Sequence, residues 1–168
     1  MAWSAKVLTV SDSVAAGRVP DGGGQAVTEA IEAAGGQVVE RAVSADGRSE
    51  VAAALRRLAE GFGGLVVTTG GTGFGPRDLT PEATLDVVDR RAPGLAEAAR
   101  AASPKGRLSR GEAGTIGRAL VLNLPGSPAG AVEQLRAVLD VVPHALALLA
   151  GEQPHPHQAH QGKRPPGA

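Results

Sequence analysis

The sequence predicts an α/β fold in which helices cover both faces of a mostly parallel sheet, giving three α/β/α layers. Short apolar, β-branched runs at residues 5–10, 37–43, 65–69 and 118–124 have the length and composition of buried strands. Between them lie segments whose apolar residues recur at helical spacing. Strands that alternate with helices in this way are typical of parallel strands joined by right-handed crossovers.

Each helix is expected where helical spacing meets a start or stop signal. The first runs from Gln25 to the Gly35-Gly36 pair, after a polar loop over residues 11–24, and the second carries apolar positions 51–58. Two short helices are expected over residues 81–102 with a break near Pro93-Gly94, and Thr80 is expected to cap the first of them. Residues 109–117 are irregular or a hairpin. Ser127 should cap a last helix that Pro143 kinks.

Composition restricts the kind of protein. A chain of 168 residues with 42% hydrophobic content suits one domain, expected over residues 1–150, whereas the polar, Pro- and His-rich residues 151–168 are expected to be a disordered tail. Equal numbers of basic and acidic residues (17 each) and only three aromatic residues argue against nucleic-acid binding. No cysteine is present, which fits a reducing cytoplasm, and no apolar run predicts a membrane span.

The strongest local pattern is the glycine-rich segment Thr68–Glu82, which follows a predicted strand and precedes a helix start. Glycines at 70, 71 and 73 allow successive backbone N–H groups to face one concavity, and Thr69 and Thr72 add hydroxyl groups. The pattern predicts a phosphate-binding loop. It matches neither the P-loop nor the dinucleotide-binding fingerprint, because Gly-Lys-Ser/Thr and Gly-x-Gly-x-x-Gly are both missing.

Three aspartates follow predicted strands, and one of them, Asp78, suggests a cation beside bound phosphates. Asp78, at the lip of the glycine-rich loop, could hold Mg²⁺ together with substrate phosphates, or it could cap a helix or pair with Arg77. Asp46 has a simpler interpretation as a helix N-cap, and Asp12 as a turn residue.

A second turn, Asn123–Pro128, repeats the order of strand, tight turn and helix N-terminus, so Pro125, Gly126 and Ser127 form either an anion contact or ordinary turn chemistry. Ser109 and Arg110 could clamp a phosphate, although Arg110 could equally be a solvated surface residue.

These segments together resemble the molybdenum-cofactor biosynthesis family, which includes the molybdopterin adenylyltransferases, the MoaB and Mog proteins and the related domain of gephyrin. The resemblance rests on Thr68–Glu82, Ser109–Gly111 with Gly114, and Asn123–Pro128, and it extends over about residues 5–150. Ser11-Asp12-Ser13 with Gly17 also resembles the family's first loop.

The resemblance implies a cytoplasmic homotrimer of three-layer α/β domains that transfers AMP from Mg²⁺-ATP to the terminal phosphate of molybdopterin and releases pyrophosphate. It implies catalytic roles for Asp78 and Asp46, with Asp78 as the Mg²⁺ ligand, and a molybdenum-insertion partner. The substrate-binding residues it implies are Ser11, Asp12, Thr69, Gly70, Gly71, Thr72, Gly73, Ser109, Arg110, Pro125, Gly126 and Ser127.

One departure is Ala129-Gly130, where relatives often carry a lysine, so a phosphate contact from that position is missing. The alternatives are a non-catalytic molybdopterin-binding protein or trimeric scaffold of the same family, and a hydrolase of a nucleotide or pyrophosphate. The sequence does not separate the adenylyltransferase branch from the MoaB branch.

Overall fold

Six strands form one sheet in the order β2-β1-β3-β6-β5-β4 in the computed structural model, which describes residues 2–152. β2 (Gly36–Ser44), β1 (Trp3–Val10), β3 (Leu65–Thr69) and β6 (Ala119–Leu124) are parallel neighbours. β5 (Ala113–Ile116) and β4 (Arg90–Arg91) complete the sheet as antiparallel strands. The predicted mostly parallel α/β sheet is confirmed.

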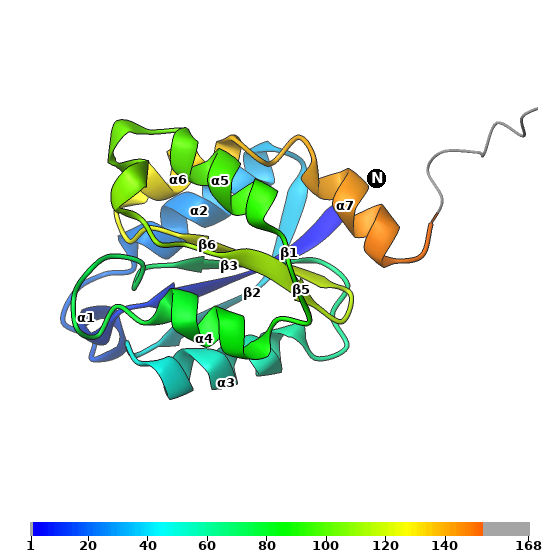
Figure 1. The fold of residues 1–168 in the computed structure, drawn as a ribbon. Helices are drawn as coiled ribbons and strands as arrows, with labels where there is room; N and C mark the ends of the chain where they lie inside the picture. The colour runs from blue at the N-terminus through cyan, green and yellow to red at the C-terminus, as the bar shows by residue number, and fades with distance from the viewer. Residues whose placement is uncertain (1, 153–168) are drawn as a thin grey trace, which may run out of the picture.

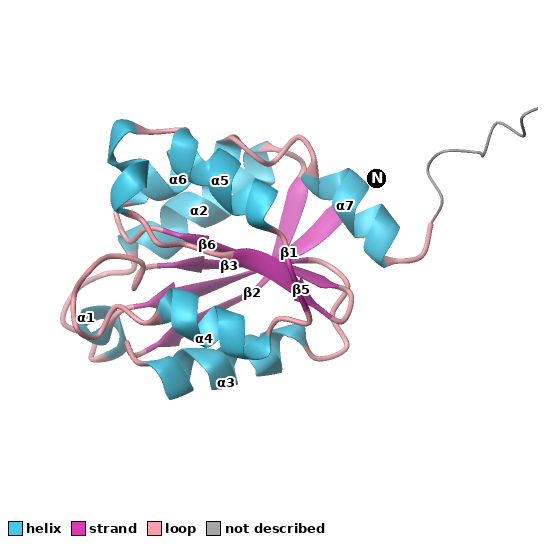
Figure 2. Cartoon of the chain, in the orientation of Figure 1, coloured by secondary structure: helices cyan, strands magenta, loops and turns pink. Residues whose placement is uncertain are grey.

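Helices cover both faces of this sheet, as Figures 1 and 2 show. One face packs against α2 (Gly22–Ala33), α5 (Pro93–Ala101), α6 (Pro128–Arg136) and α7 (Val142–Leu149). The other packs against α3 (Arg48–Ala59) and α4 (Thr80–Val87). Two short elements, α1 (Asp12–Ala15) and the 3₁₀ helix η1 (Pro104–Leu108), lie in the loops.

The strands contribute to two cores because successive side chains of a strand point to opposite faces. On β1, Ala5 and Val7 pack with α2 and α6, whereas Leu8 and Val10 pack with α3. Every residue of β3 and β6 is buried, as expected for central strands covered on both sides. This packing fixes the positions at which the strands end.

Several elements differ from their predicted form. α2 begins at Gly22, earlier than predicted, because the Asp21 carboxylate accepts the Gly24 N–H and caps a start that its three glycines do not favour. The predicted loop 11–24 contains α1, and the interval between α4 and α5 contains β4. The single kinked last helix is wrong: α6 ends at Arg136, and Pro143 sits in the first turn of a separate α7, where its missing N–H costs nothing.

Within the described part of the chain, no helix has both the length and the hydrophobicity needed to cross a membrane. The predicted tail from residue 153 onward lies outside the described residues. The division into a domain over residues 1–150 and a tail therefore stays a prediction.

Candidate functional site

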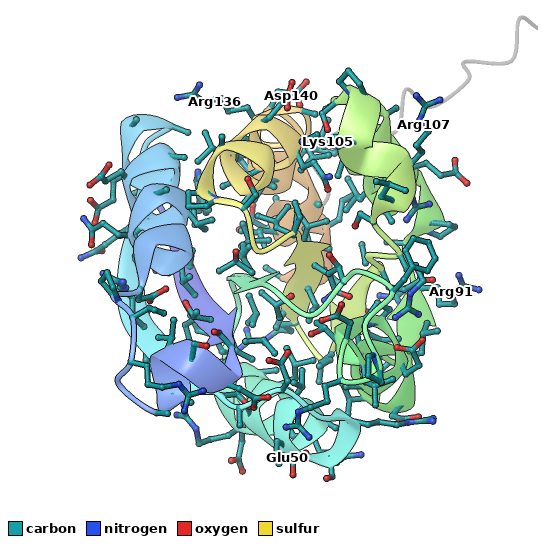
Figure 3. All side chains as sticks on the ribbon, turned by 90° about the vertical axis from the view of Figure 1, so that its left-hand side faces the viewer. Glu50, Arg91, Lys105, Arg107, Arg136 and Asp140 are labelled. Atoms are coloured by element: carbon teal, nitrogen blue, oxygen red, sulfur yellow. The ribbon has the colours of Figure 1, made fainter. Side chains whose placement is uncertain are left out.

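The carboxyl ends of the four parallel strands meet at one edge of the sheet, which Figure 3 shows facing the viewer. In open parallel sheets this edge is where ligands bind. The loops after the strands are hydrogen-bonded to their neighbours: the Ser11 N–H donates to Ser44 O (3.0 Å), and the Gly70 N–H donates to Leu124 O (3.0 Å). The segments singled out from the sequence therefore converge.

Asp12 and Asp46 lock the first two loops together. The Asp12 N–H donates to Asp46 Oδ2 (3.0 Å), and the Asp46 N–H donates to Asp12 Oδ1 (3.1 Å). Arg77 reaches from the glycine-rich loop to this pair, with Nε 2.7 Å from Asp12 Oδ2 and Nη2 2.7 Å from Asp46 O. Asp46 does not cap α3, whose N-cap is Gly47 without a side-chain bond. The partner of Arg77 is Asp12.

The two aspartates differ in electrostatics. Hydrogen bonding from Arg77 holds the pKa of Asp12 below its ordinary value. Burial raises the pKa of Asp46, and the negative charges of Asp12 and Asp78 act in the same direction. The carboxylates of Asp12 and Asp78 thus lie close enough to act on that of Asp46, and a bound cation would relieve the repulsion among the three.

Two glycines shape the bend that follows β3. Gly70 and Gly71 have φ of 107° and 68°, in the left-handed region that favours glycine. A Cβ on Gly70 would lie 2.1 Å from Val10 O, and one on Gly71 would lie 2.3 Å from Thr80 Oγ1. Thr80 does not cap α4 as predicted; its hydroxyl donates to Gly70 O (3.0 Å) and holds the bend.

Arg110 is engaged with the protein. Its Nε donates to Gly73 O (2.9 Å), its Nη2 donates to Asp78 O (2.6 Å), and its guanidinium pairs with Glu82. The Arg110 N–H also donates to Thr72 O (2.9 Å). The guanidinium therefore positions the glycine-rich loop instead of facing a pocket.

The second turn is joined to the first through Thr69, whose hydroxyl donates to Pro125 O (2.8 Å). Asn123 fixes the end of β6: its side chain is buried and donates to the hydroxyl oxygens of Thr68 (3.0 Å) and Thr84 (2.9 Å). Ser127 caps α6 as predicted, because its Oγ accepts the Gly130 N–H. The N-terminus of α6 lies at the site, because Ser127 and Pro128 are among the residues that line the pockets described below.

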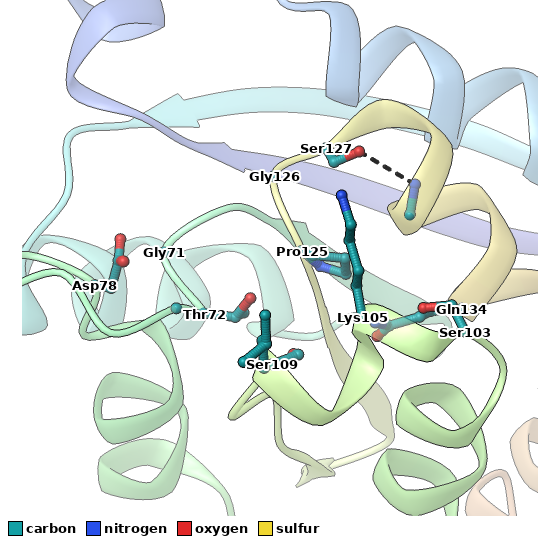
Figure 4. Close-up of a pocket in the computed structure, with 13 residues that line it drawn as sticks. Gly71, Thr72, Asp78, Ser103, Lys105, Ser109, Pro125, Gly126, Ser127 and Gln134 are labelled. Carbon is teal, nitrogen blue, oxygen red and sulfur yellow. Dashed lines mark hydrogen bonds between the residues drawn. The ribbon is translucent and has the colours of Figure 1, made fainter.

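Two pockets open at this edge and share Gly71, Asp78 and Gly126 in their walls. The first, here called the lysine pocket, has a volume of about 400 Å³. Figure 4 shows Asp78 and Thr72 on one side of it and Lys105, Gln134 and Ser127 on the other. Its remaining walls are formed by Gly71, Gly73, Ser103, Leu108, Ser109, Pro125, Gly126 and Gly130.

The second, here called the carboxylate pocket, has a volume of about 420 Å³. Asp21, Asp46 and Asp78 contribute carboxylates to its wall, and no Lys or Arg does so. Its remaining walls are formed by Thr9, Val10, Ser11, Val14, Val19, Pro20, Gly22, Gly23, Thr69, Gly70, Gly71, Gly126 and Pro128. Asp21 is paired with Arg41, so Asp46 and Asp78 are the carboxylates whose charge a cation bound with an anion would offset.

Asp78 lies between the two pockets. Its Oδ2 accepts the Gly75 N–H (2.9 Å), and its side chain lies 3.0 Å from the position of a Cβ on Gly73. It is not the N-cap of α4, which is Leu79. Residues 2–152 contain no group of three His, Cys, Asp or Glu side chains arranged to hold a metal by themselves. A Mg²⁺ ion here would need substrate phosphates and water as its other ligands, as is usual for Mg²⁺.

Most residues predicted for the site line one of the pockets, and Asp12 and Arg110 line neither. The hydroxyls of Ser11 and Thr69 are used within the fold, the first as the acceptor that caps α1 and the second toward Pro125 O. Sequence reasoning missed Asp21, Lys105 and Gln134. No local motif marks Lys105 or Gln134, whereas Asp21 before three glycines was a readable N-cap signal.

Adjoining pockets at glycine-rich strand ends of a three-layer α/β fold are typical of proteins that bind phosphate-bearing ligands. The model of the probable molybdopterin binding domain family matches residues 6–151. The chain therefore belongs to this family of molybdenum cofactor biosynthesis, and the resemblance seen in the sequence is confirmed.

Named relatives agree with this assignment. The chain is 37% identical over 151 residues to a molybdenum cofactor biosynthesis bifunctional protein of Chlorobaculum tepidum, covering 87% of this chain and 48% of the relative. It is 45% identical over 91 residues to a molybdopterin adenylyltransferase of Helicobacter pylori, covering 52% of each protein. The chain thus spans about half the length of these relatives.

Solved structures match over nearly their whole length. The molybdopterin biosynthesis enzyme MoaB of Thermus thermophilus has a TM-score of 0.84 and 44% identity, covering 89% of this chain and 98% of that one. A MogA structure has a TM-score of 0.81 and 40% identity, covering 87% and 99%. The similarity thus includes both the MoaB and the Mog branches.

Proposed function

We propose that this chain is a molybdopterin adenylyltransferase, which transfers AMP from ATP to the terminal phosphate of molybdopterin. The observation that supports this most directly is the common wall of the two pockets: two ligands bound side by side would meet at Gly71, Asp78 and Gly126. Relatives named molybdopterin adenylyltransferase add independent support.

The chemistry suits the residues present. A phosphate monoester is largely ionised at neutral pH, so its oxygen can attack the α-phosphorus of ATP without a general base. A new P–O bond forms, the bond between the α-phosphorus and its bridging oxygen breaks, and pyrophosphate leaves. Because both reactants are anions, the protein must align them and offset their charge, which N–H groups of the glycine-rich turns can do.

The carboxylates fit a divalent cation. Asp78 adjoins both pockets. Burial and neighbouring negative charges raise the pKa of Asp46, and a cation bound nearby would stabilise its charged carboxylate. We assign Asp78, with Asp46 beside it, to holding Mg²⁺. When bound with ATP, Mg²⁺ supplies positive charge that offsets the phosphates.

The cellular setting belongs to the same proposal. ATP-dependent transfer by a chain without cysteine suits the cytoplasm. Assembly into a homotrimer is part of the proposal because the family resemblance implies it, and the exposed Val39 and Val43 (51% and 47%) on the edge strand β2 offer apolar surface to another subunit. Analytical ultracentrifugation gives the subunit number, and a monomeric mass would reject the trimer.

The test is an assay of the purified chain with Mg²⁺-ATP and molybdopterin. We expect pyrophosphate and adenylyl-molybdopterin in equal amounts, and loss of both products when EDTA removes the Mg²⁺. Binding of molybdopterin without product would favour the non-catalytic alternative, and pyrophosphate release without molybdopterin would favour a hydrolase.

A further inference from the structure

Lys105 is a positive charge in the lysine pocket, and no carboxylate among the described residues pairs with it. It lies on η1 and contributes to the pocket wall. In Figure 4 its side chain extends across the pocket toward Ser127, at the N-terminus of α6. Among residues 2–152, no carboxylate forms an ion pair with it, and Asp78 stands on the opposite wall.

The neighbourhood of Lys105 is electrostatically unsatisfied. A helix N-terminus carries partial positive charge, and the Lys105 side chain extends toward Ser127, the N-cap residue of α6. The Lys105 ammonium and the α6 N-terminus repel each other, and an anion bound between them would attract both. The arrangement favours a phosphate group at this point of the pocket.

Gln134 supplies a second, independent observation. It lies on α6 in the wall of the same pocket, is only 2% exposed, and its Oε1 has no hydrogen-bond partner within residues 2–152. Buried polar atoms are ordinarily hydrogen-bonded, so an unpaired acceptor in a pocket wall indicates a donor that arrives with a ligand. A ligand that carries both a phosphate and an N–H group would satisfy both residues.

We propose that Lys105 is a phosphate-binding residue of the lysine pocket and that Gln134 accepts an N–H from the same ligand. The proposal rests on the function proposed above only for the identity of the ligands. ATP and molybdopterin each carry a phosphate group and a ring amine, so either could contact both Lys105 and Gln134. The experiment decides which of the two ligands does so.

The experiment measures binding of Mg²⁺-ATP and of molybdopterin separately, by isothermal titration calorimetry. Lys105→Met should weaken one ligand by at least about tenfold, because an ion-paired hydrogen bond is lost. Lys105→Arg should retain binding to within about threefold, since the charge remains. Arg107→Met is the matched control: Arg107 lies on the same η1, extends outward in Figure 3 and lines neither pocket, so binding should not change.

Gln134→Leu separates ligand binding from folding. It removes the unpaired oxygen, so the thermal unfolding midpoint should not fall, while the ligand that depends on Lys105 should bind less tightly. If Lys105→Met fails to fold, Lys105→Gln replaces it as a neutral but polar variant. A fall in the unfolding midpoint with both affinities unchanged would mean that Lys105 serves the fold alone, and would overturn the proposal.

The outcomes also separate this proposal from the proposed reaction. Wild-type protein that binds one ligand through Lys105 but releases no pyrophosphate would reject the reaction and keep the phosphate site. Normal turnover with wild-type KM for both substrates in Lys105→Met would reject the phosphate site and keep the reaction.

Discussion

The two pockets at the sheet edge share three residues and yet differ in charge. The lysine pocket has the Lys105 ammonium, which forms no ion pair within residues 2–152, and a single carboxylate, Asp78. The carboxylate pocket has Asp46 and Asp78 together with Asp21, whose charge Arg41 offsets, and no Lys or Arg is among the described residues of its wall. The first pocket therefore favours an anion by itself, and the second favours an anion accompanied by a cation. Asp78 belongs to both, so it is the residue through which the two ligands would influence each other.

The largest effect should follow loss of the shared carboxylate. Asp78→Asn keeps an oxygen that can accept the Gly75 N–H, so the fold should persist, while turnover should fall at least about a hundredfold because the charge between the pockets is gone. Pyrophosphate release measures this. Asp140→Asn, an exposed change between α6 and α7, is the control. Unchanged turnover in a folded Asp78→Asn protein would remove the proposed role.

A smaller effect should follow a change in the wall that separates the pockets. Gly71→Ala places a Cβ 2.3 Å from Thr80 Oγ1 at φ of 68°, whereas Gly61→Ala, at φ of 62°, meets no atom within 4 Å. In both variants the left-handed backbone lowers the free energy of unfolding by about 1–2 kcal/mol. Only Gly71→Ala should lose further stability and weaken both ligands. Urea unfolding and calorimetry test this, and equal losses in the two variants would contradict it.

The smallest effect concerns Asp21, which lies in the carboxylate pocket but serves the fold. Burial alone would raise its pKa, but hydrogen bonds from the Gly24 N–H, Thr9 and Arg41 outweigh it, so the pKa lies below its ordinary value. A lowered folded-state pKa stabilises the protein above the unfolded value of about 4, and this contribution is lost as the pH falls through the folded value.

Asp21→Asn should therefore destabilise the protein by up to about 1 kcal/mol at pH 7, because the charge paired with the partly exposed Arg41 is lost while an N-cap oxygen remains. The difference from wild type should shrink toward zero on acidification below about pH 4. Urea unfolding across this range is the measurement. A difference that stays constant down to pH 3 would show that the charge of Asp21 contributes nothing.

The site loops were predictable from the sequence where the pattern lies within a few consecutive residues. Gly70, Gly71 and Gly73 occur between an apolar strand and a helix start, and the parallel order of the strands then requires the loops to share an edge. Ser127 before Pro128 was readable as a cap for the same reason, because capping involves residues only three positions apart.

Prediction was weaker where a side chain had several available partners. Arg110 was expected to contact phosphate or solvent, and it instead holds Gly73 O, Asp78 O and Glu82. A guanidinium has five N–H donors that suit carboxylates, carbonyls and phosphates alike, so only the distances in the folded protein select among them. Arg77 could have paired with the adjacent Asp78, but in the folded protein it pairs with Asp12, 65 positions away.

The sequence by itself determined the alternation of the main strands and helices, the parallel sheet and the glycine-rich turns, because these follow from periodicity and backbone freedom within short segments. It did not predict α1, β4 or the separation of α6 from α7. Only the tertiary structure decided that Asp78 lies between two pockets and that Lys105 and Gln134 line one of them. The physical reason is that pocket walls are assembled from segments far apart along the chain, and their contacts depend on how η1 and α6 pack beside the strand ends.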